Sequence, residues 1–152
     1  LLVAGGVAVS SRVVETDREA VHRGTQEFIA AVAEADRSTV ESLLAPRLTL
    51  RSDGNSAPLN ARSFILGSLD MVKQDIEQHS SSVQESAIHA ENAGRTQFVF
   101  RVHRSRSFGV GMSTWVLEWQ KYPDGNWQIN TIDLVAINGN RPSGEVFSRL
   151  RF

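Results

Sequence analysis

The first half of the chain carries apolar side chains at intervals of about 3.6 residues, which is the period of an α-helix. One such stripe predicts a helix over residues 17–35, and Thr16 with Glu19 fits a capping box at its start. A second stripe predicts a helix over residues 61–79, with Asn60 as its N-cap. Gly24 lies on the apolar face of the first helix, where it would let another element approach closely.

The segment between these two helices predicts a shorter helix and a strand. Ser38 and Glu41 fit a second capping box, and Pro46 ends the short helix that begins there. Residues 48–51 predict a short strand, which a run of turn-forming residues separates from Asn60.

Alternation of apolar and polar residues replaces the helical repeat in the second half of the chain. It predicts four strands, at residues 83–91, 95–104, 110–122 and 127–137. Phe98 and Phe100 share one face of the second of these strands, which is typical of a half-buried antiparallel strand. The order of elements indicates an α+β fold in which a curved antiparallel sheet wraps around the N-terminal helices.

The turn at Tyr122–Asn126 sets the register of the last two strands. Pro-Asp-Gly suits a three-residue hairpin loop, because proline presets the first backbone angle and glycine takes the left-handed position. On that register one face carries three tryptophans with an acid at its far end, and the opposed pairs are Trp119 with Ile129, Leu117 with Thr131, and Trp115 with Asp133. A two-residue loop at Asp124-Gly125 is the alternative, and it would move Trp127 and Asp133 to the other face.

Composition narrows the classes of protein to consider. The chain has 152 residues, 41% of them hydrophobic and 22% charged, which is typical of one globular domain. Its net charge of −1 argues against a general nucleic-acid binder. The absence of cysteine excludes disulfides, thiolate catalysis and cysteine metal sites. The four histidines show no metal-ligand spacing, and no phosphate-binding or dinucleotide motif is present, so we predict no metal and no cofactor.

The two ends of the chain differ in composition from the segment between them. Leu1–Val9 is an apolar run, and a membrane-spanning helix needs about 20 residues. Residues 1–15 are therefore interpreted as a packed arm or as the remnant of a longer anchor or signal segment upstream of Leu1. The second alternative implies a membrane tether or an extracytoplasmic location, and the first leaves a cytoplasmic location open. Residues 138–152 form a short, basic, amphipathic tail.

Two motifs resemble the NTF2-like superfamily. Ala33-Glu34-Ala35-Asp36-Arg37-Ser38-Thr39-Val40-Glu41-Ser42-Leu43-Leu44-Ala45-Pro46 is similar to the helical segment that precedes the first strand in its SnoaL-like branches. Asp124-Gly125-Asn126-Trp127-Gln128-Ile129 is similar to the Gly-x-Trp-x-Ile opening of the last strand. Together the motifs frame one domain over residues 16–137.

The resemblance implies a cone-shaped α+β barrel with a pocket between the sheet and the helices. It also implies a homodimer through the outer face of the sheet, which is frequent in the superfamily. It implies no single activity, because the superfamily includes isomerases, dehydratases, polyketide cyclases, transport factors and domains without known chemistry.

Asp133 is the candidate catalytic residue. Across from Trp115 on the apolar face, desolvation would favour its protonated form and so suit it to general acid or base chemistry. In the SnoaL-like cyclases an acid late in the chain works in the pocket, usually with a histidine, whereas the nearby inward position here is Thr131. The alternative is a carboxylate that an arginine satisfies or that lies exposed at the end of the sheet.

The aromatic residues are the candidate ligand-binding set. The tryptophans could form a wall for a flat, apolar ligand, and the full set is Trp115, Trp119, Trp127, Phe98, Phe100, Thr131 and Tyr122. Residues of this kind at period-two spacing also form ordinary sheet cores, and the indole N–H groups then need partners. We therefore expect a domain that binds a small apolar ligand in its cone or self-associates. A small-molecule isomerase, dehydratase or cyclase that uses Asp133 is the alternative.

Overall fold

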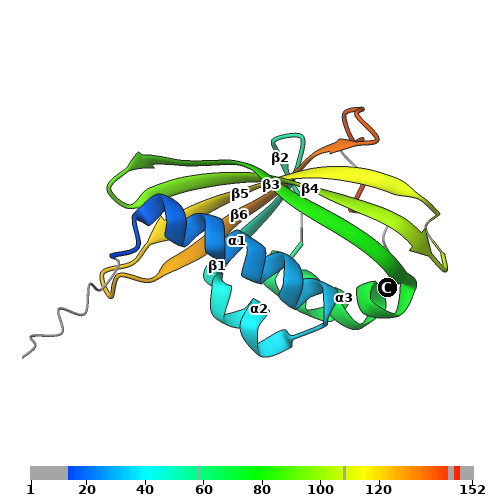
Figure 1. Cartoon of the computed structure of the whole chain (residues 1–152), viewed down its shortest axis with the longest axis horizontal. Helices are drawn as coiled ribbons and strands as arrows, with labels where there is room; N and C mark the ends of the chain where they lie inside the picture. The colour runs from blue at the N-terminus through cyan, green and yellow to red at the C-terminus, as the bar shows by residue number, and fades with distance from the viewer. Residues whose placement is uncertain (1–13, 58, 108, 144–145, 148–152) are drawn as a thin grey trace, which may run out of the picture.

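A computed structural model describes residues 14–57, 59–107, 109–143 and 146–147. Three helices cover one face of a curved six-stranded sheet whose strand order is β2-β1-β6-β5-β4-β3 (Figure 1). The helices are α1 (Asp17–Ala33), α2 (Arg37–Leu43) and α3 (Ala61–Asp75), and the strands are β1 (Leu44–Ser52), β2 (Asn55–Ser56), β3 (Ile76–Ala90), β4 (Ala93–Ser105), β5 (Gly111–Lys121) and β6 (Trp127–Ile137). This confirms the predicted α+β fold with a curved sheet around the helices. The sheet is not antiparallel throughout, because β1 and β6 pair in parallel.

The capping predictions are confirmed at two helices and wrong at the third. The Thr16–Glu19 capping box is present at α1, and Asn60 accepts the backbone N–H of Ser63 at 3.0 Å. Helix α2 begins two residues earlier than predicted, because Asp36 rather than Ser38 is its N-cap. The Asp36 carboxylate accepts the backbone N–H of Thr39 at 3.1 Å.

The prediction that the third helix continues to residue 79 is wrong. Helix α3 ends at Asp75, and the chain turns into the long edge strand β3 at Ile76. Ile76 and His79 pair with Ser105 and Val102 of β4. Pairing with a strand distant in the sequence therefore outweighs the local helical pattern here.

The core lies between the helices and the concave face of the sheet. Its fully buried side chains include Val21 of α1, Leu117 and Trp119 of β5, and Ile129 and Ile132 of β6. Each is 2% exposed or less, so the centre of the domain is closely packed.

The end of the described chain also reaches this core. Phe147 is 7% exposed and packs edge-on against Phe64 of α3, with 6.0 Å between ring centroids. Its ring centroid lies 6.5 Å from that of Trp115. Residues 144–145 and 148–152 of the predicted tail, and residues 1–13, which hold most of the predicted arm, lie outside the described residues. Within the described residues, no helix is long and apolar enough to cross a membrane.

The last hairpin has the predicted three-residue loop. Tyr122 donates its backbone N–H to the Asn126 carbonyl at 2.9 Å, and Gly125 takes the left-handed conformation with φ of 86°. Trp119 pairs with Ile129, as predicted. Beyond that pair, Asn130 forms a β-bulge, so that Glu118 pairs with Thr131.

The bulge makes the predicted register wrong at the far end of the hairpin. Leu117 pairs with Ile132 instead of Thr131, and Trp115 pairs with Leu134 instead of Asp133. One extra residue reverses the alternation of the side chains that follow it, here as far as the next irregularity, which lies between Leu134 and Ala136. Thr131 and Asp133 therefore face the outer, convex side of the sheet, away from the helices.

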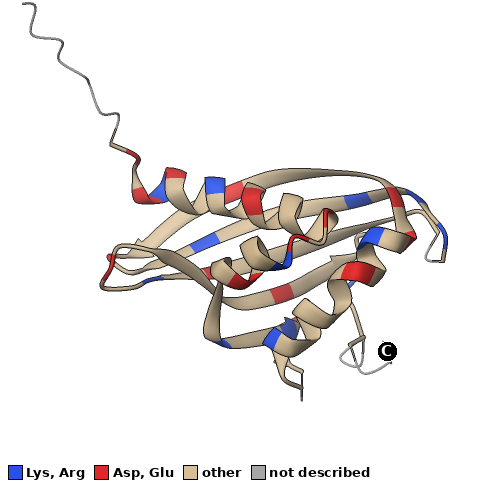
Figure 2. Cartoon of the chain, turned by 90° about the horizontal axis from the view of Figure 1, so that it is seen from below, with Lys and Arg blue, Asp and Glu red and all other residues tan. Residues whose placement is uncertain are grey.

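Charged residues are interspersed along the helical side of the molecule. Figure 2 views this side and shows Lys and Arg mixed with Asp and Glu along the helices, with no large area of one sign. The described helices therefore carry no basic stripe of the kind that nucleic-acid binding uses.

Candidate functional site

Trp119 forms a closed hydrogen-bond network at the centre of the cone. Its indole Nε1–H donates to Thr96 Oγ1 at 3.0 Å, and the Thr96 hydroxyl lies 2.7 Å from the Thr25 hydroxyl. Thr25 in turn donates to the carbonyl of Val21 at 2.8 Å. Every member is buried and has a partner, so the network holds α1 against β4 and β5 and offers a ligand no free polar group.

The other two tryptophans also have partners for their indole N–H groups. Trp115 donates to Ser113 Oγ at 2.7 Å and packs against Phe147. Trp127 donates to Asp17 Oδ1 at 3.2 Å. The three indoles thus make the contacts that core tryptophans require.

Two predicted phenylalanines complete the aromatic set on the concave face. Phe98 is 5% exposed within the core, and Phe100 stacks on His79 with 5.1 Å between ring centroids. None of the five aromatic residues lines either of the two cavities described below. Their part in ligand binding stays a prediction.

Asp17 ties the start of α1 to the last hairpin. Its carboxylate accepts hydrogen bonds from Lys121 Nζ at 2.7 Å and from Trp127 Nε1 at 3.2 Å. The Lys121 hydrogen bond, followed by that of Trp127, holds the pKa of Asp17 below its usual value.

We expect Asp17→Asn to be destabilising at neutral pH and progressively less so in acid. A carboxylate with a lowered pKa in the folded state stabilises the fold above its unfolded pKa, and this contribution is lost as the pH falls through the folded pKa. Urea denaturation of both proteins from neutral pH to well below 3.8, the ordinary pKa of the group, measures the difference. A difference that does not change with pH would show that the charge of Asp17 does not matter.

The structure places Asp133 away from the tryptophans. It pairs with Val116 on the convex face and is half-buried there. Its Oδ1 accepts the backbone N–H of Gly54 at 3.3 Å, which ties the turn between β1 and β2 to β6. The predicted position across from Trp115 is wrong, because the Asn130 bulge moves Asp133 to the other face.

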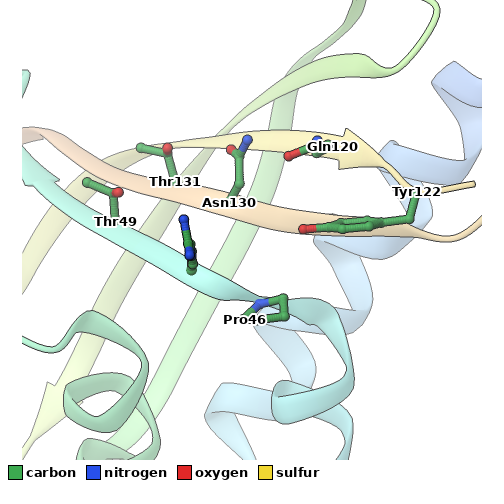
Figure 3. Close-up of a pocket in the computed structure, with 7 residues that line it drawn as sticks. Pro46, Thr49, Gln120, Tyr122, Asn130 and Thr131 are labelled. Atoms are coloured by element: carbon green, nitrogen blue, oxygen red, sulfur yellow. The ribbon is translucent and has the colours of Figure 1, made fainter.

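A groove opens on the convex face where β1 leaves β6. Leu44 pairs with Ile129 and Thr49 pairs with Thr131, so in the ladder four residues of β1, 45–48, stand opposite the single residue 130 of β6. Pro46 within this detour has no N–H to donate to a ladder. The groove has a volume of about 430 Å³, and its lining residues, most of them labelled in Figure 3, are Pro46, Arg47, Thr49, Gln120, Tyr122, Asn130 and Thr131.

The polar side chains of this groove are without protein partners. Within the described ranges, none of the six forms a hydrogen bond or ion pair through its side chain: Arg47, Thr49, Gln120, Tyr122, Asn130 and Thr131. Asn130 Oδ1 is also fully buried. The groove thus presents a guanidinium, three hydroxyls and two amides to whatever enters it, in contrast to the satisfied network around Trp119.

A second cavity of about 290 Å³ lies between α1 and the edge strand β3. It is lined by Gln26, Ile29 and Ala30 of α1 and by His79, Ser81, Ser82 and Val83 of β3. Among the described residues, no group of three His, Asp or Glu side chains is placed to hold a metal ion.

Two residues of the predicted ligand set line this groove. Tyr122 and Thr131 converge on one cavity, but on the face of the sheet opposite Trp115 and Trp119, and their part in ligand binding stays a prediction. The predicted set does not include Arg47 and Asn130, because their convergence depends on the parallel pairing of β1 with β6. A proline inside a strand segment, Pro46, was the available signal of an interrupted ladder.

No family model matches the chain, and no curated protein matches it. Solved structures do match over most of their length. An NTF2-like superfamily protein from Salmonella enterica serovar Typhimurium is 16% identical, with a TM-score of 0.62, over 84% of this chain and 95% of that one. An NTF2-like protein from Cytophaga hutchinsonii is 12% identical, with a TM-score of 0.63, over 80% and 98%. A ketosteroid isomerase-like protein from Erwinia carotovora atroseptica is 11% identical, with a TM-score of 0.62, over 78% and 96%.

These likenesses establish the fold. The chain has the NTF2-like fold, which the two sequence motifs indicate, and at such low identity the similarity carries no activity with it.

Proposed function

We propose that this chain is a ligand-binding NTF2-like domain whose site is the groove on the convex face of the sheet. The observation that carries the proposal is the set of six polar side chains, all without a partner among the described residues, that line one cavity. A volume of about 430 Å³ falls within the roughly 300–1,000 Å³ of small-molecule sites. The ligand is polar, because the groove offers hydrogen-bonding groups where the cone offers apolar packing.

The close packing inside the cone supports a ligand site on the convex face rather than inside the cone. Trp119, Leu117 and Ile129 fill the space between the sheet and α1, and each is 2% exposed or less. A flat apolar ligand would have to displace close-packed side chains, whose loss of contact disfavours binding. The proposed site therefore differs from the pocket between sheet and helices that the family resemblance implies.

The composition of the groove supports binding rather than acid–base chemistry. No carboxylate or histidine is among its lining residues, and Asp133 is bound instead to the backbone of Gly54. An enzyme that uses Asp133 as general acid or base needs that carboxylate beside the substrate. The isomerase, dehydratase or cyclase alternative has no such arrangement to support it.

Self-association is the second use of the convex face. A homodimer through this face would cover the groove and satisfy the same six side chains from a partner subunit. Val99 and Val116 lie on this face but are each only 3% exposed, so a contact there would be mainly polar. This polar character supports a small ligand over a tight dimer, since stable homodimer interfaces are more apolar at their centre.

Nuclear magnetic resonance with a mixture of small polar molecules tests the proposal. We expect amide shifts to change at Thr49, Gln120 and Asn130, while the indole N–H signal of Trp119 stays unchanged. Changes at the Trp119 indole instead would place the ligand inside the cone. Spectra without ligand at two protein concentrations provide the control, because a dimer through the convex face would shift the same amides as the concentration rises.

A further inference from the structure

Among the described residues, the only charged side chain that lines the groove is that of Arg47, which is positive. Arg47 is exposed, and it forms no ion pair or hydrogen bond with any described residue. The two carboxylates beside Thr131 on the same face are occupied elsewhere: Glu118 lies 3.9 Å from the Arg51 guanidinium, and Asp133 accepts the Gly54 N–H. A guanidinium with its donors unused is suited to bind a carboxylate or phosphate group.

Asn130 adds a second requirement, which is that the ligand also carries a hydrogen-bond donor. Its Oδ1 is buried and has no hydrogen-bond donor within the described part of the chain. The bulge and the detour of β1 leave this side chain without a neighbouring strand to satisfy it. A buried acceptor without a donor is costly, so the Asn130 side chain is stabilised when it turns toward the groove and accepts an O–H or N–H from a ligand there.

The remaining lining groups narrow the ligand further. The hydroxyls of Thr49, Thr131 and Tyr122 can each donate one hydrogen bond and accept others. Figure 3 shows the Tyr122 ring extending along the groove, with its hydroxyl on the side of Asn130. A ligand with several hydroxyl groups can exchange hydrogen bonds with all three, whereas a simple anion leaves them unused.

We infer that the groove binds a small hydroxylated carboxylate, that is, a hydroxy acid or sugar acid. The carboxylate pairs with Arg47, one hydroxyl donates to Asn130 Oδ1, and the other hydroxyls bond to the threonine and tyrosine side chains. This inference rests on the proposed function and adds the charge and the donor that the ligand must carry.

Titrations with three small molecules, followed by nuclear magnetic resonance, test separately whether binding needs the negative charge and whether it needs the hydroxyl groups. Gluconate has both the charge and the hydroxyls, sorbitol has only the hydroxyls, and acetate has only the charge. We expect gluconate to bind about tenfold or more tightly than either of the others, which corresponds to the loss of one charged hydrogen bond. Equal binding of sorbitol and gluconate would overturn the role of Arg47, while the groove would remain a ligand site.

Matched variants assign the effect to single residues. Arg47→Ala should weaken gluconate binding about tenfold and leave sorbitol binding unchanged, whereas Arg18→Ala, which removes an exposed charge from α1, should change neither. Asn130→Ala should weaken gluconate and sorbitol alike and spare acetate. Binding of gluconate that both groove variants leave intact would overturn the inference. If other polar molecules shift the amide signals of the groove but none of these three does, the ligand class is overturned and the proposed function stands. If no molecule shifts these signals, the proposed function is overturned as well.

Discussion

Replacing Trp119 with alanine should lower the free energy of unfolding by about 3–5 kcal/mol. The indole is 2% exposed and packs between the sheet and α1, so its removal leaves a large cavity. The substitution also removes the hydrogen bond to Thr96 at the centre of the core. Urea denaturation followed by far-UV circular dichroism measures the change.

Trp127→Ala is the control for this prediction. Trp127 is half-buried at the start of β6, where its indole bonds to Asp17, and its loss should cost about 1–2 kcal/mol. If the two alanine variants were equally stable, Trp119 would not be the residue around which the core packs. A Trp119→Ala protein with wild-type stability would mean that the cone tolerates an empty interior, as a domain with an internal ligand pocket does.

Gly24→Ala should destabilise the domain by about 1–2 kcal/mol, although alanine is the better helix former. A β-carbon at Gly24 would lie 2.7 Å from Cη2 of Trp119, which is too close for any relaxed contact. The cost of overpacking therefore exceeds the gain of about 0.5–1 kcal/mol that alanine brings to a helix interior. Thermal and urea denaturation measure the sign of the change in the free energy of unfolding directly.

The same substitution in α3 should have the opposite sign. Gly67 is exposed, and a β-carbon there would meet no atom within 4 Å. Gly67→Ala should thus stabilise the domain by about 0.5–1 kcal/mol through helix propensity alone. In a Trp119→Leu background the cost of Gly24→Ala should shrink, and a cost that persists unchanged would locate the clash elsewhere.

Local features of the sequence predicted most of the fold. The apolar stripe of α1, its capping box at Thr16 and the Asn60 cap of α3 depend on residues close together in the chain, and the structure confirms them. The three-residue loop at Pro123–Gly125 is likewise confirmed, because proline and glycine restrict the backbone themselves.

Apart from the N-cap of α2, the errors arise where contacts come from distant residues. Ile76–His79 continues a helical pattern but pairs with β4, because the ladder to Ser105 and Val102 satisfies the backbone groups that a further helical turn would otherwise pair. Asn130 gives no local sign of a bulge, and one unforeseen residue was enough to reverse the faces of Thr131 and Asp133. The candidate catalytic acid was therefore placed on the wrong side of the sheet.

The sequence by itself determined the element types, the hairpin loop and the α+β class, since these follow from periodicity and backbone preference within short windows. Only the tertiary structure decided which face each polar residue occupies. The groove needs the parallel pairing of β1 with β6, the detour around Pro46 and the bulge at Asn130, which bring Arg47 and Tyr122 together from distant parts of the chain. Convergence of this kind depends on the register between strands, and local sequence does not specify that register.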